Sequence, residues 1–265
     1  PALDGVGLVI FDEFHERSLQ ADLALALCLD SQRGLREDLR LLVMSATLNG
    51  AAVAQLLGDA SIIATDGRTH PVIQHYLPHD PEGLDLNVVV RTVLTALAEH
   101  IGDLLVFLPG GGEIRQVQRR LAAESACAGL ALVPLYGDLP AEAQQRAIQP
   151  DAAGRRKIVL ATPIAETSLT IEGVRSVVDA GWTRVPRFDP RSGLTRLETI
   201  RISADAAEQR AGRAGRLGPG ICYRLWSQAT QGRLRPQRIP EILEADLAPL
   251  ALELAQWGVA DPATL

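Results

Sequence analysis

Short apolar runs separated by amphipathic segments constrain the fold of this chain more than any other feature. Seven runs read as strands, at residues 5–11, 39–44, 103–108, 130–136, 157–162, 175–180 and 221–226. Helical patterns lie between them, at residues 18–32, 49–57, 85–99, 111–124 and 140–149. Near-continuous apolar strands that alternate with helices are typical of a parallel sheet covered on both faces. The sequence therefore predicts an α/β fold built from right-handed crossovers.

Two breaks in this alternation predict the domain boundaries. Gly, Pro and Asp cluster at residues 66–83, which places a boundary near residue 67. A second break follows Trp226, and the pattern after it is purely helical up to the chain end. Between the breaks, residues 182–203 hold two extended runs around the turn sequence DPRSGL, which predicts a β-hairpin.

Composition excludes several classes of protein. The 265 residues are 47% apolar and 22% charged, which is globular, and no apolar run approaches the ~20 residues of a membrane span. The three cysteines are widely spaced, so neither a disulfide framework nor a CxxC metal site is available, as expected in a reducing cytoplasm. The first residues lack a Met and a signal-peptide pattern, and we expect a piece of a longer protein.

Positive charge is concentrated in one part of an otherwise acidic chain. The net charge is −6, yet residues 184–238 hold 12 Arg and four acidic residues, so this block carries +8. A basic block inside an acidic protein favours a local anion site over a solubility feature. Four of the arginines lie on the predicted hairpin and are expected to project from it: Arg184, Arg187, Arg191 and Arg196.

Three strand ends carry side chains suited to phosphate chemistry. Asp12 and Glu13 follow the first strand, where an Asp can hold Mg²⁺ and a Glu can orient or deprotonate a water. Ser45-Ala46-Thr47 follows the second, and ATPIAETSLT (161–170) follows the strand at 157–162. Hydroxyls and helix-start amides at such a place suit a phosphate oxygen. An acidic loop or ordinary helix caps would give each of these patterns taken alone.

The segment QRAGRAGR (209–216) is the most specific signal. Arg210, Arg213 and Arg216 recur every third residue and fall on one flank of a helix, with Gly212 and Gly215 leaving room for a partner. The three positive charges repel one another unless an anion lies beside them. Guanidinium groups can bind the oxygens of a phosphoryl group with two parallel hydrogen bonds. A solvated basic face is the alternative, although such faces usually interleave Glu.

Taken in order, the motifs resemble those of one family. They are DEFH (12–15), SAT (45–47), LVFLPG (105–110), ATPIAETSLT (161–170) and QRAGRAGR (209–216). This set resembles the DEAH-box helicases of superfamily 2, and DEFHERSLQADLAL (12–25) is similar to their bacterial HrpB type. The resemblance covers essentially the whole chain. It implies two RecA-like domains that hold ATP between them and single-stranded RNA across both.

The resemblance also assigns parts of the chain to domains. Residues 1–66 look like the C-terminal half of the first RecA-like domain, and residues 67–235 look like the whole second one. Residues 236–265 resemble the start of a winged-helix domain. The implied activity is RNA unwinding and translocation coupled to NTP hydrolysis, with ATP and Mg²⁺ as cofactors and RNA as partner.

Roles carried over from the family fall into three groups. In the first domain, Asp12 looks like the Mg²⁺ ligand through water, Glu13 the catalytic base, and Ser45 and Thr47 the coupling motif beside the nucleotide. In the second, the implied catalytic and nucleotide-contacting residues are Gln209 (linked to His15), Arg213 and Arg216 (fingers on the γ-phosphate) and Ser168 (a sensor), while Arg210 supports the helix. The implied RNA-binding residues are Thr162, Thr167, Arg184, Arg187 and Arg191, the last three on a strand-separating hairpin.

Two departures and two alternatives remain at this level. The phosphate-binding loop GxxxxGK[ST] is absent and would precede Pro1, so we expect this piece to be inactive alone. Pro163 stands where the family usually has Asn. One alternative is a relative that binds RNA without catalysis. The presence of Asp12, Glu13 and both finger arginines argues against it. A translocase acting on DNA is the other, because backbone contacts carry little base information.

Overall fold

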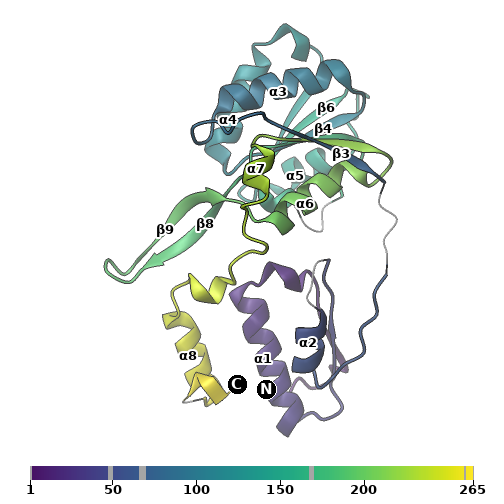
Figure 1. Cartoon of the computed structure of the whole chain (residues 1–265). Helices are drawn as coiled ribbons and strands as arrows, with labels where there is room; N and C mark the ends of the chain where they lie inside the picture. Colours follow the sequence, from purple (N-terminus) through teal and green to yellow (C-terminus); the bar gives the residue numbers. More distant parts are fainter. Residues whose placement is uncertain (1, 47–49, 66–69, 167–169, 260, 265) are drawn as a thin grey trace. The chain divides into compact units, whose positions relative to one another are not determined.

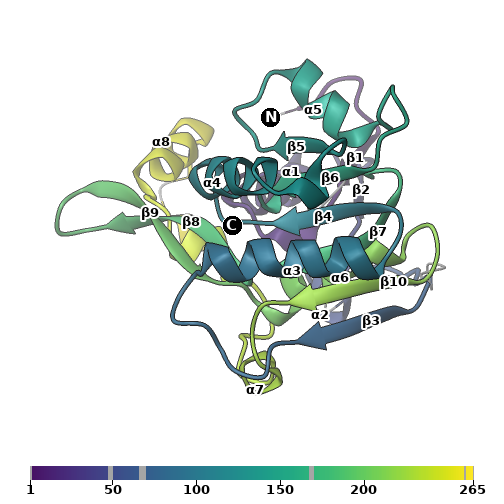
Figure 2. The same ribbon diagram turned by 90° about the horizontal axis from the view of Figure 1, so that it is seen from above.

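The computed structural model describes residues 2–46, 50–65, 70–166, 170–259 and 261–264. Its contacts divide the chain into two compact units. Unit 1 comprises residues 1–66, 186–198 and 238–265, and unit 2 comprises residues 67–185 and 199–237. Figures 1 and 2 show the ribbon from two sides, and each unit is considered by itself.

The described part of unit 2 is built on a six-stranded parallel sheet. The strand order is β3 (Val72–Tyr76), β10 (Gly220–Arg224), β7 (Val174–Asp179), β4 (Asp103–Phe107), β6 (Lys157–Ala161) and β5 (Ala131–Leu135). Its helices are α3 (Leu86–Glu99), α4 (Gly111–Ala122), α5 (Ala141–Ile148), α6 (Ala204–Gly212) and the short α7 (Gln228–Gln231). The predicted parallel α/β sheet is confirmed.

Alternation along the central strand β4 explains why both faces of this sheet are covered. Leu104 and Val106 pack with α3 and α4, whereas Leu105 and Phe107 pack with residues of α5 and α6 on the other face (Figure 1). All four side chains are at most 1% exposed. A strand buried on both faces reads as a continuous apolar run, which is why the sequence located it.

Strand β3 is a strand that the sequence analysis missed. It lies within the segment taken as a boundary, and it pairs with β10 in the register Val72 to Gly220 through Tyr76 to Arg224. Pro71 and Pro78 flank it in the sequence. As an edge strand it is only partly covered, and Ile73 is 61% exposed, so it lacks the continuous apolar run of the central strands.

Unit 1 has a smaller core. Strand β1 (Leu8–Phe11) runs parallel to β2 (Arg40–Val43), beside α1 (Leu19–Gly34) and α2 (Gly50–Leu56). The Ser18 hydroxyl accepts a hydrogen bond from Ala21 N at 3.2 Å and caps α1 as predicted. The C-terminal helix α8 (Ala248–Trp257) belongs to the same unit, and the Trp257 indole donates to Asp30 of α1 at 2.9 Å.

The predicted hairpin is present as β8 (Trp182–Asp189) and β9 (Leu194–Arg201). Asp189 organises the turn, because its carboxylate accepts hydrogen bonds from Arg191 N at 3.0 Å and from the Ser192 hydroxyl at 2.9 Å. Gly193 ends the turn with φ +66°, a left-handed conformation that glycine adopts without strain. The hairpin residues 186–198 belong to unit 1, and the base on either side belongs to unit 2.

The remaining short elements are 3₁₀ turns at Phe14–Glu16, Ser125–Cys127, Pro163–Ala165, Arg213–Gly215, Glu241–Leu243 and Pro262–Thr264. Among the described residues, none of the helices has both the length and the apolar character that crossing a membrane requires.

Candidate functional site

In unit 1 the candidate site is the loop that leaves β1. Parallel strands end at the same edge of a sheet, so Asp12 and Glu13 after β1 share an edge with Ser45 after β2. The Phe14 amide donates to the Met44 carbonyl at 3.1 Å and holds the two loops together. The structure therefore brings together the unit 1 residues that the sequence singled out, except Thr47, which lies outside the described residues.

The backbone of this loop is unusual at two positions. Glu13 and Arg17 have φ values of +50° and +53°, a left-handed conformation that is costly for residues with a side chain. Such conformations cluster at functional sites because the surrounding structure must enforce them. Here the Glu13 amide donates to the Asp12 carboxylate at 2.8 Å, and the next residue, Phe14, is only 4% exposed.

His15 connects the two loops of the edge. Its Nδ1 lies 3.5 Å from Glu13 Oε2 and 3.5 Å from the Ala46 amide nitrogen. A protonated Nδ1 donates to the carboxylate, whereas an unprotonated Nδ1 accepts from the amide, so the two contacts are alternatives. The ring is 9% exposed, which leaves the imidazole as a buried connection from Glu13 to the loop after β2.

In unit 2 the candidate residues gather at the carboxyl edge of the large sheet. Thr162 follows β6, and its backbone continues into the 3₁₀ turn at Pro163–Ala165. Arg213 donates to the Glu166 carbonyl, and Arg216 donates to the Thr170 hydroxyl. The arginine segment and the segment after β6 therefore meet. Thr167 and Ser168 lie outside the described residues.

The three arginines do not form one flank of a continuous helix, which corrects the expectation. Helix α6 ends at Gly212, and Arg213–Gly215 form a 3₁₀ turn. Arg216 is exposed and Arg213 is 9% exposed, whereas Arg210 is completely buried. The carboxylates that Arg210 meets belong to the protein itself. Arg210 therefore has an internal role, and Arg216 remains on the surface.

Arg210 is the centre of a buried network. Its Nε donates to Glu166 Oε1 at 2.6 Å, and its Nη1 donates to Asp179 Oδ1 at 2.8 Å. The guanidinium also lies 5.0 Å from the centre of the Phe107 ring. Burial raises the pKa of Asp179, and the charge of Arg210 opposes this shift. The network joins the ends of β4, β6 and β7 to α6, in agreement with the expected supporting role of Arg210.

Sequence reasoning missed the two carboxylates of this network. Asp179 is the last residue of an apolar strand, and its side chain is completely buried. Glu166 lies within the ATPIAETSLT motif and is 2% exposed. A charged residue that ends a buried strand requires a cation nearby, and this signal could have pointed from Asp179 to an arginine.

The side chain of Gln209 has hydrogen-bonding groups that are not used within the described part of the unit. Neither Oε1 nor Nε2 of its side chain has a partner among the described residues, although both atoms are buried. Buried amides are normally satisfied, so this side chain is suited to a polar group that the chain itself does not supply.

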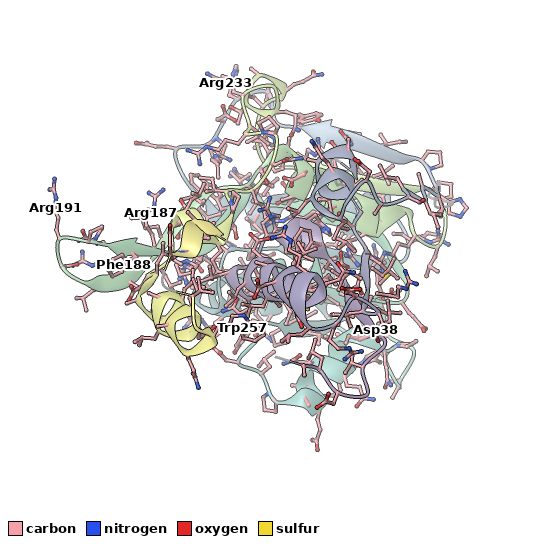
Figure 3. The ribbon with its side chains drawn as sticks, turned by 90° about the horizontal axis from the view of Figure 1, so that it is seen from below. Asp38, Arg187, Phe188, Arg191, Arg233 and Trp257 are labelled. Atoms are coloured by element: carbon pink, nitrogen blue, oxygen red, sulfur yellow. The ribbon has the colours of Figure 1, made fainter. Side chains whose placement is uncertain are left out.

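Several arginines of the basic block form ion pairs inside their own unit. Arg184 donates to Glu113 at 2.8 Å, Arg224 to Glu208 at 2.8 Å, and Arg187 to both Glu198 (2.9 Å) and Glu244 (2.8 Å). Arg184 and Arg187 are exposed on the hairpin, and each already meets a carboxylate of its own unit. Arg191 does extend from the hairpin tip (Figure 3). Local net charge overstated the positive surface because distant acidic residues fold back onto it.

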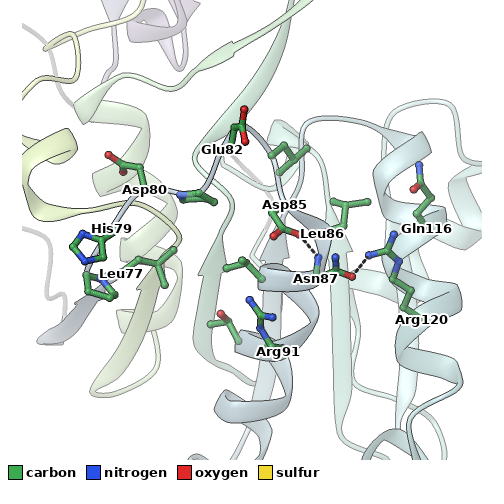
Figure 4. A pocket seen from close by; sticks show the side chains of 15 residues that line it. Leu77, His79, Asp80, Glu82, Asp85, Leu86, Asn87, Arg91, Gln116 and Arg120 are labelled. Carbon is green, nitrogen blue, oxygen red and sulfur yellow. Dashed lines mark hydrogen bonds between the residues drawn. The ribbon is translucent and has the colours of Figure 1, made fainter.

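One hollow in unit 2 is separate from these residues. It has a volume of about 880 Å³ and lies beside the loop before α3 and the faces of α3 and α4 (Figure 4). Internal hydrogen bonds occupy part of its wall, from Arg120 to Asn87 (2.8 Å) and from the Asn87 amide to Asp85 (2.8 Å). None of the predicted site residues lines it, so the strand-end residues remain the candidate site.

The unit 1 edge after β1 could hold a metal ion through one or two protein ligands. No group of three or more His, Cys, Asp or Glu side chains within the described ranges could hold a metal. Mg²⁺ commonly takes one or two protein carboxylates and completes its shell with water and phosphate oxygens. Asp12 is exposed at its strand end and suits that arrangement.

Comparison with known proteins agrees with this chemistry. The model of the helicase conserved C-terminal domain matches residues 86–218. The ATP-dependent RNA helicase HrpB of Escherichia coli is 53% identical over the whole chain, and the chloroplastic ATP-dependent RNA helicase DEAH12 of Arabidopsis thaliana is 39% identical over 97% of it. The chain spans 33% and 15% of these relatives, respectively.

Solved structures give the same result. A crystal structure of the E. coli DExH-box NTPase HrpB matches 100% of the chain and 32% of the solved chain, with a TM-score of 0.89 and 53% identity. A crystal structure of the E. coli DEAH/RHA helicase HrpB matches 99% of the chain and 34% of the solved chain, with a TM-score of 0.91 and 54% identity. The chain therefore belongs to the family of the helicase conserved C-terminal domain and is similar over its whole length to HrpB helicases.

Proposed function

We propose that this chain is the central part of an ATP-dependent RNA helicase, which couples NTP hydrolysis to movement on RNA and to its unwinding. The observation that carries the proposal is the pair of strand-end sites. One holds Asp12, Glu13 and His15, and the other holds Gln209 with Arg213 and Arg216. Carboxylates for the metal and the water, together with guanidinium groups for phosphate charge, are the parts that phosphoryl transfer requires.

In unit 1, Asp12 would hold Mg²⁺ through water, and Glu13 would accept a proton from the attacking water. When bound, Mg–ATP supplies the phosphoanhydride to be broken and the positive charge that offsets its oxygens. The 3.5 Å contact between Glu13 Oε2 and His15 Nδ1 supports a role for His15 in orienting that carboxylate. Ser45 and Thr47 would couple this site to movement of the domain.

In unit 2, Arg213 and Arg216 would neutralise charge on the γ-phosphate, Gln209 would pair with His15, and Ser168 would sense the phosphate. The open hydrogen-bonding capacity of Gln209 and the exposure of Arg216 support these roles. Catalysis would then rest on positioning and on charge stabilisation rather than on covalent chemistry.

RNA would cross both domains of the parent protein. Thr162 and Thr167 would contact its phosphates, and the hairpin with Arg184, Arg187 and Arg191 would separate strands. Of these three arginines, Arg191 at the tip is best placed for a phosphate, because Arg184 and Arg187 already meet carboxylates.

We infer the corresponding domain parts: residues 1–66 end the first RecA-like domain, 67–235 form the second, and 236–265 begin a winged-helix domain. The three cysteines are free and buried within the described part of the chain, which supports the reducing cytoplasm as its compartment. Because this chain has no GxxxxGK[ST] loop to hold the β- and γ-phosphates, the isolated piece should hydrolyse ATP negligibly.

The test is the Glu13→Gln variant of the full-length protein. We expect RNA-stimulated ATP hydrolysis to fall at least ~100-fold, with RNA affinity within about twofold of the wild type, because a general base contributes 10²–10⁴-fold. Glu37→Gln is a matched control, since Glu37 is exposed in the same unit. Equal activity of Glu13→Gln and wild type would refute the proposal. Stimulation by DNA strands but not by matched RNA, at one salt concentration, would instead favour a DNA translocase.

A further inference from the structure

A single 3₁₀ turn in unit 1 contacts two segments that are far away in the sequence. The turn begins after Pro240, covers Glu241–Leu243 and continues to Glu244. The Glu244 amide donates to the Glu241 carbonyl at 2.9 Å, and the Leu243 amide donates to the Pro240 carbonyl at 3.0 Å. These bonds fix the backbone between the two glutamates, so a displacement at one is transmitted to the other.

The first contact is with the segment that follows the proposed catalytic carboxylates. Glu241 Oε2 accepts a hydrogen bond from the Leu19 amide at 2.8 Å, and the Glu241 amide donates to the Arg17 carbonyl at 3.1 Å. Leu19 begins α1, where backbone amides lack partners within the helix and negative charge is favourable. Arg17 lies four residues after Glu13, in the same left-handed backbone region.

The second contact is with the hairpin. Glu244 Oε1 accepts a hydrogen bond from Arg187 Nη2 at 2.8 Å, and the Glu244 carbonyl accepts one from the Phe188 amide at 2.9 Å. Arg187 also donates to Glu198 on the opposite strand at 2.9 Å, so one guanidinium joins both hairpin strands to the turn. Figure 3 shows Arg187 beside the yellow C-terminal segment, whereas Arg191 points away from it.

We propose that Glu244 and Arg187 are positioning residues that connect the loop of Asp12 and Glu13 to the distal half of the hairpin. This inference rests on the proposed helicase function. Through the Glu241–Glu244 turn, the position of residues 186–198 depends on unit 1, with which they also group by contacts. A change in the loop during hydrolysis then reaches the part of the hairpin that separates strands.

The consequence is a specific defect when the pair is broken. The carboxylates that contact the nucleotide remain intact, so hydrolysis continues, but the hairpin is no longer held while RNA is pulled against it. Fewer base pairs are then opened for each ATP consumed. A residue that only stabilised the fold would reduce both activities together.

The experiment uses the full-length protein and measures RNA-stimulated ATP hydrolysis and duplex unwinding in parallel. For Glu244→Arg we expect kcat and KM for ATP within twofold of wild type, and base pairs unwound per ATP reduced at least fivefold. The isosteric Glu244→Gln should reduce this ratio at least twofold.

Glu253→Gln is the control, because Glu253 is exposed on α8 and its change in charge equals that of Glu244→Gln. The inference is overturned if Glu244→Gln and Glu244→Arg unwind like wild type, or if hydrolysis and unwinding fall together. Should Glu244→Arg fail to fold, as judged by thermal unfolding, Glu244→Gln alone decides. Failure of the proposed function itself gives a different result, namely wild-type protein without RNA-stimulated hydrolysis.

Discussion

Replacing Arg210 by Ala tests whether the network around it stabilises unit 2. The substitution removes a completely buried guanidinium and leaves the carboxylates of Glu166 and Asp179 without the hydrogen bonds of 2.6 and 2.8 Å that they accept. Removing one partner of a buried ion pair costs about 3–5 kcal/mol, because the remaining charge is neither paired nor hydrated. We therefore expect the free energy of unfolding of unit 2 to fall by about 3–5 kcal/mol.

Urea denaturation followed by tryptophan fluorescence measures this loss. Trp226 is 1% exposed in the core of unit 2, so its emission reports on that unit, and a Trp257→Phe background removes the signal from unit 1. Arg233→Ala is a matched control in unit 2. Arg233 is exposed, and its removal should change stability by less than about 0.5 kcal/mol.

The effect should also depend on pH in a defined direction. Burial raises the pKa of Asp179 above its ordinary value of 3.8, so the folded protein holds this proton to higher pH than the unfolded chain. The resulting destabilisation appears as the pH rises above that ordinary value and is absent below it. Without Arg210 the shift grows, and the loss should be larger at pH 8 than at pH 5. A loss below about 1 kcal/mol, or one of equal size at both pH values, would refute this reasoning.

Two further outcomes follow from other buried groups. Lys157→Met should lower the stability of unit 2 by about 1–3 kcal/mol in the same urea assay, because the Ala147 and Gln149 carbonyls lose the ammonium that bonds them at 3.0 and 2.5 Å; stability equal to wild type would contradict this. Cys222 should resist alkylation at pH 8 in the native protein and react in urea, because burial raises the pKa of its thiol. Mass spectrometry after a short pulse of iodoacetamide measures this, and rapid labelling of the folded chain would show the reasoning to be wrong.

The sequence was sufficient for the central elements of the fold for a physical reason. Strands such as β4 and β6 are buried on both faces, so each must be a continuous apolar run. The edge strand β3 escapes this rule because one side of it is open, and its sequence VIQHY between two prolines resembles a loop. The hairpin was predictable from its turn, where Asp189, Pro190 and Gly193 have defined conformational roles.

The candidate site was predictable only in part. The loop after β1 and the arginine segment carry their residues in short contiguous motifs, so the sequence displays them directly. Their partners, and those of the hairpin, come from elsewhere in the chain. Asp179 meets Arg210 of the arginine segment across 31 positions, and Glu244 meets Arg187 of the hairpin across 57. Pairings at such separations depend on the topology of the sheet and of the connecting turns, which local periodicity does not encode.

The left-handed backbone at Glu13 has a consequence for how this protein tolerates change. A glycine or an asparagine would adopt that conformation at a lower free-energy cost. Either substitution should therefore stabilise the folded state. The proposed function makes Glu13 the base that takes a proton from water. Selection for heat resistance alone would therefore replace it with residues that cannot do so. Variants selected there in a thermal screen would unfold at a higher temperature and, under the proposed function, would hydrolyse ATP more slowly.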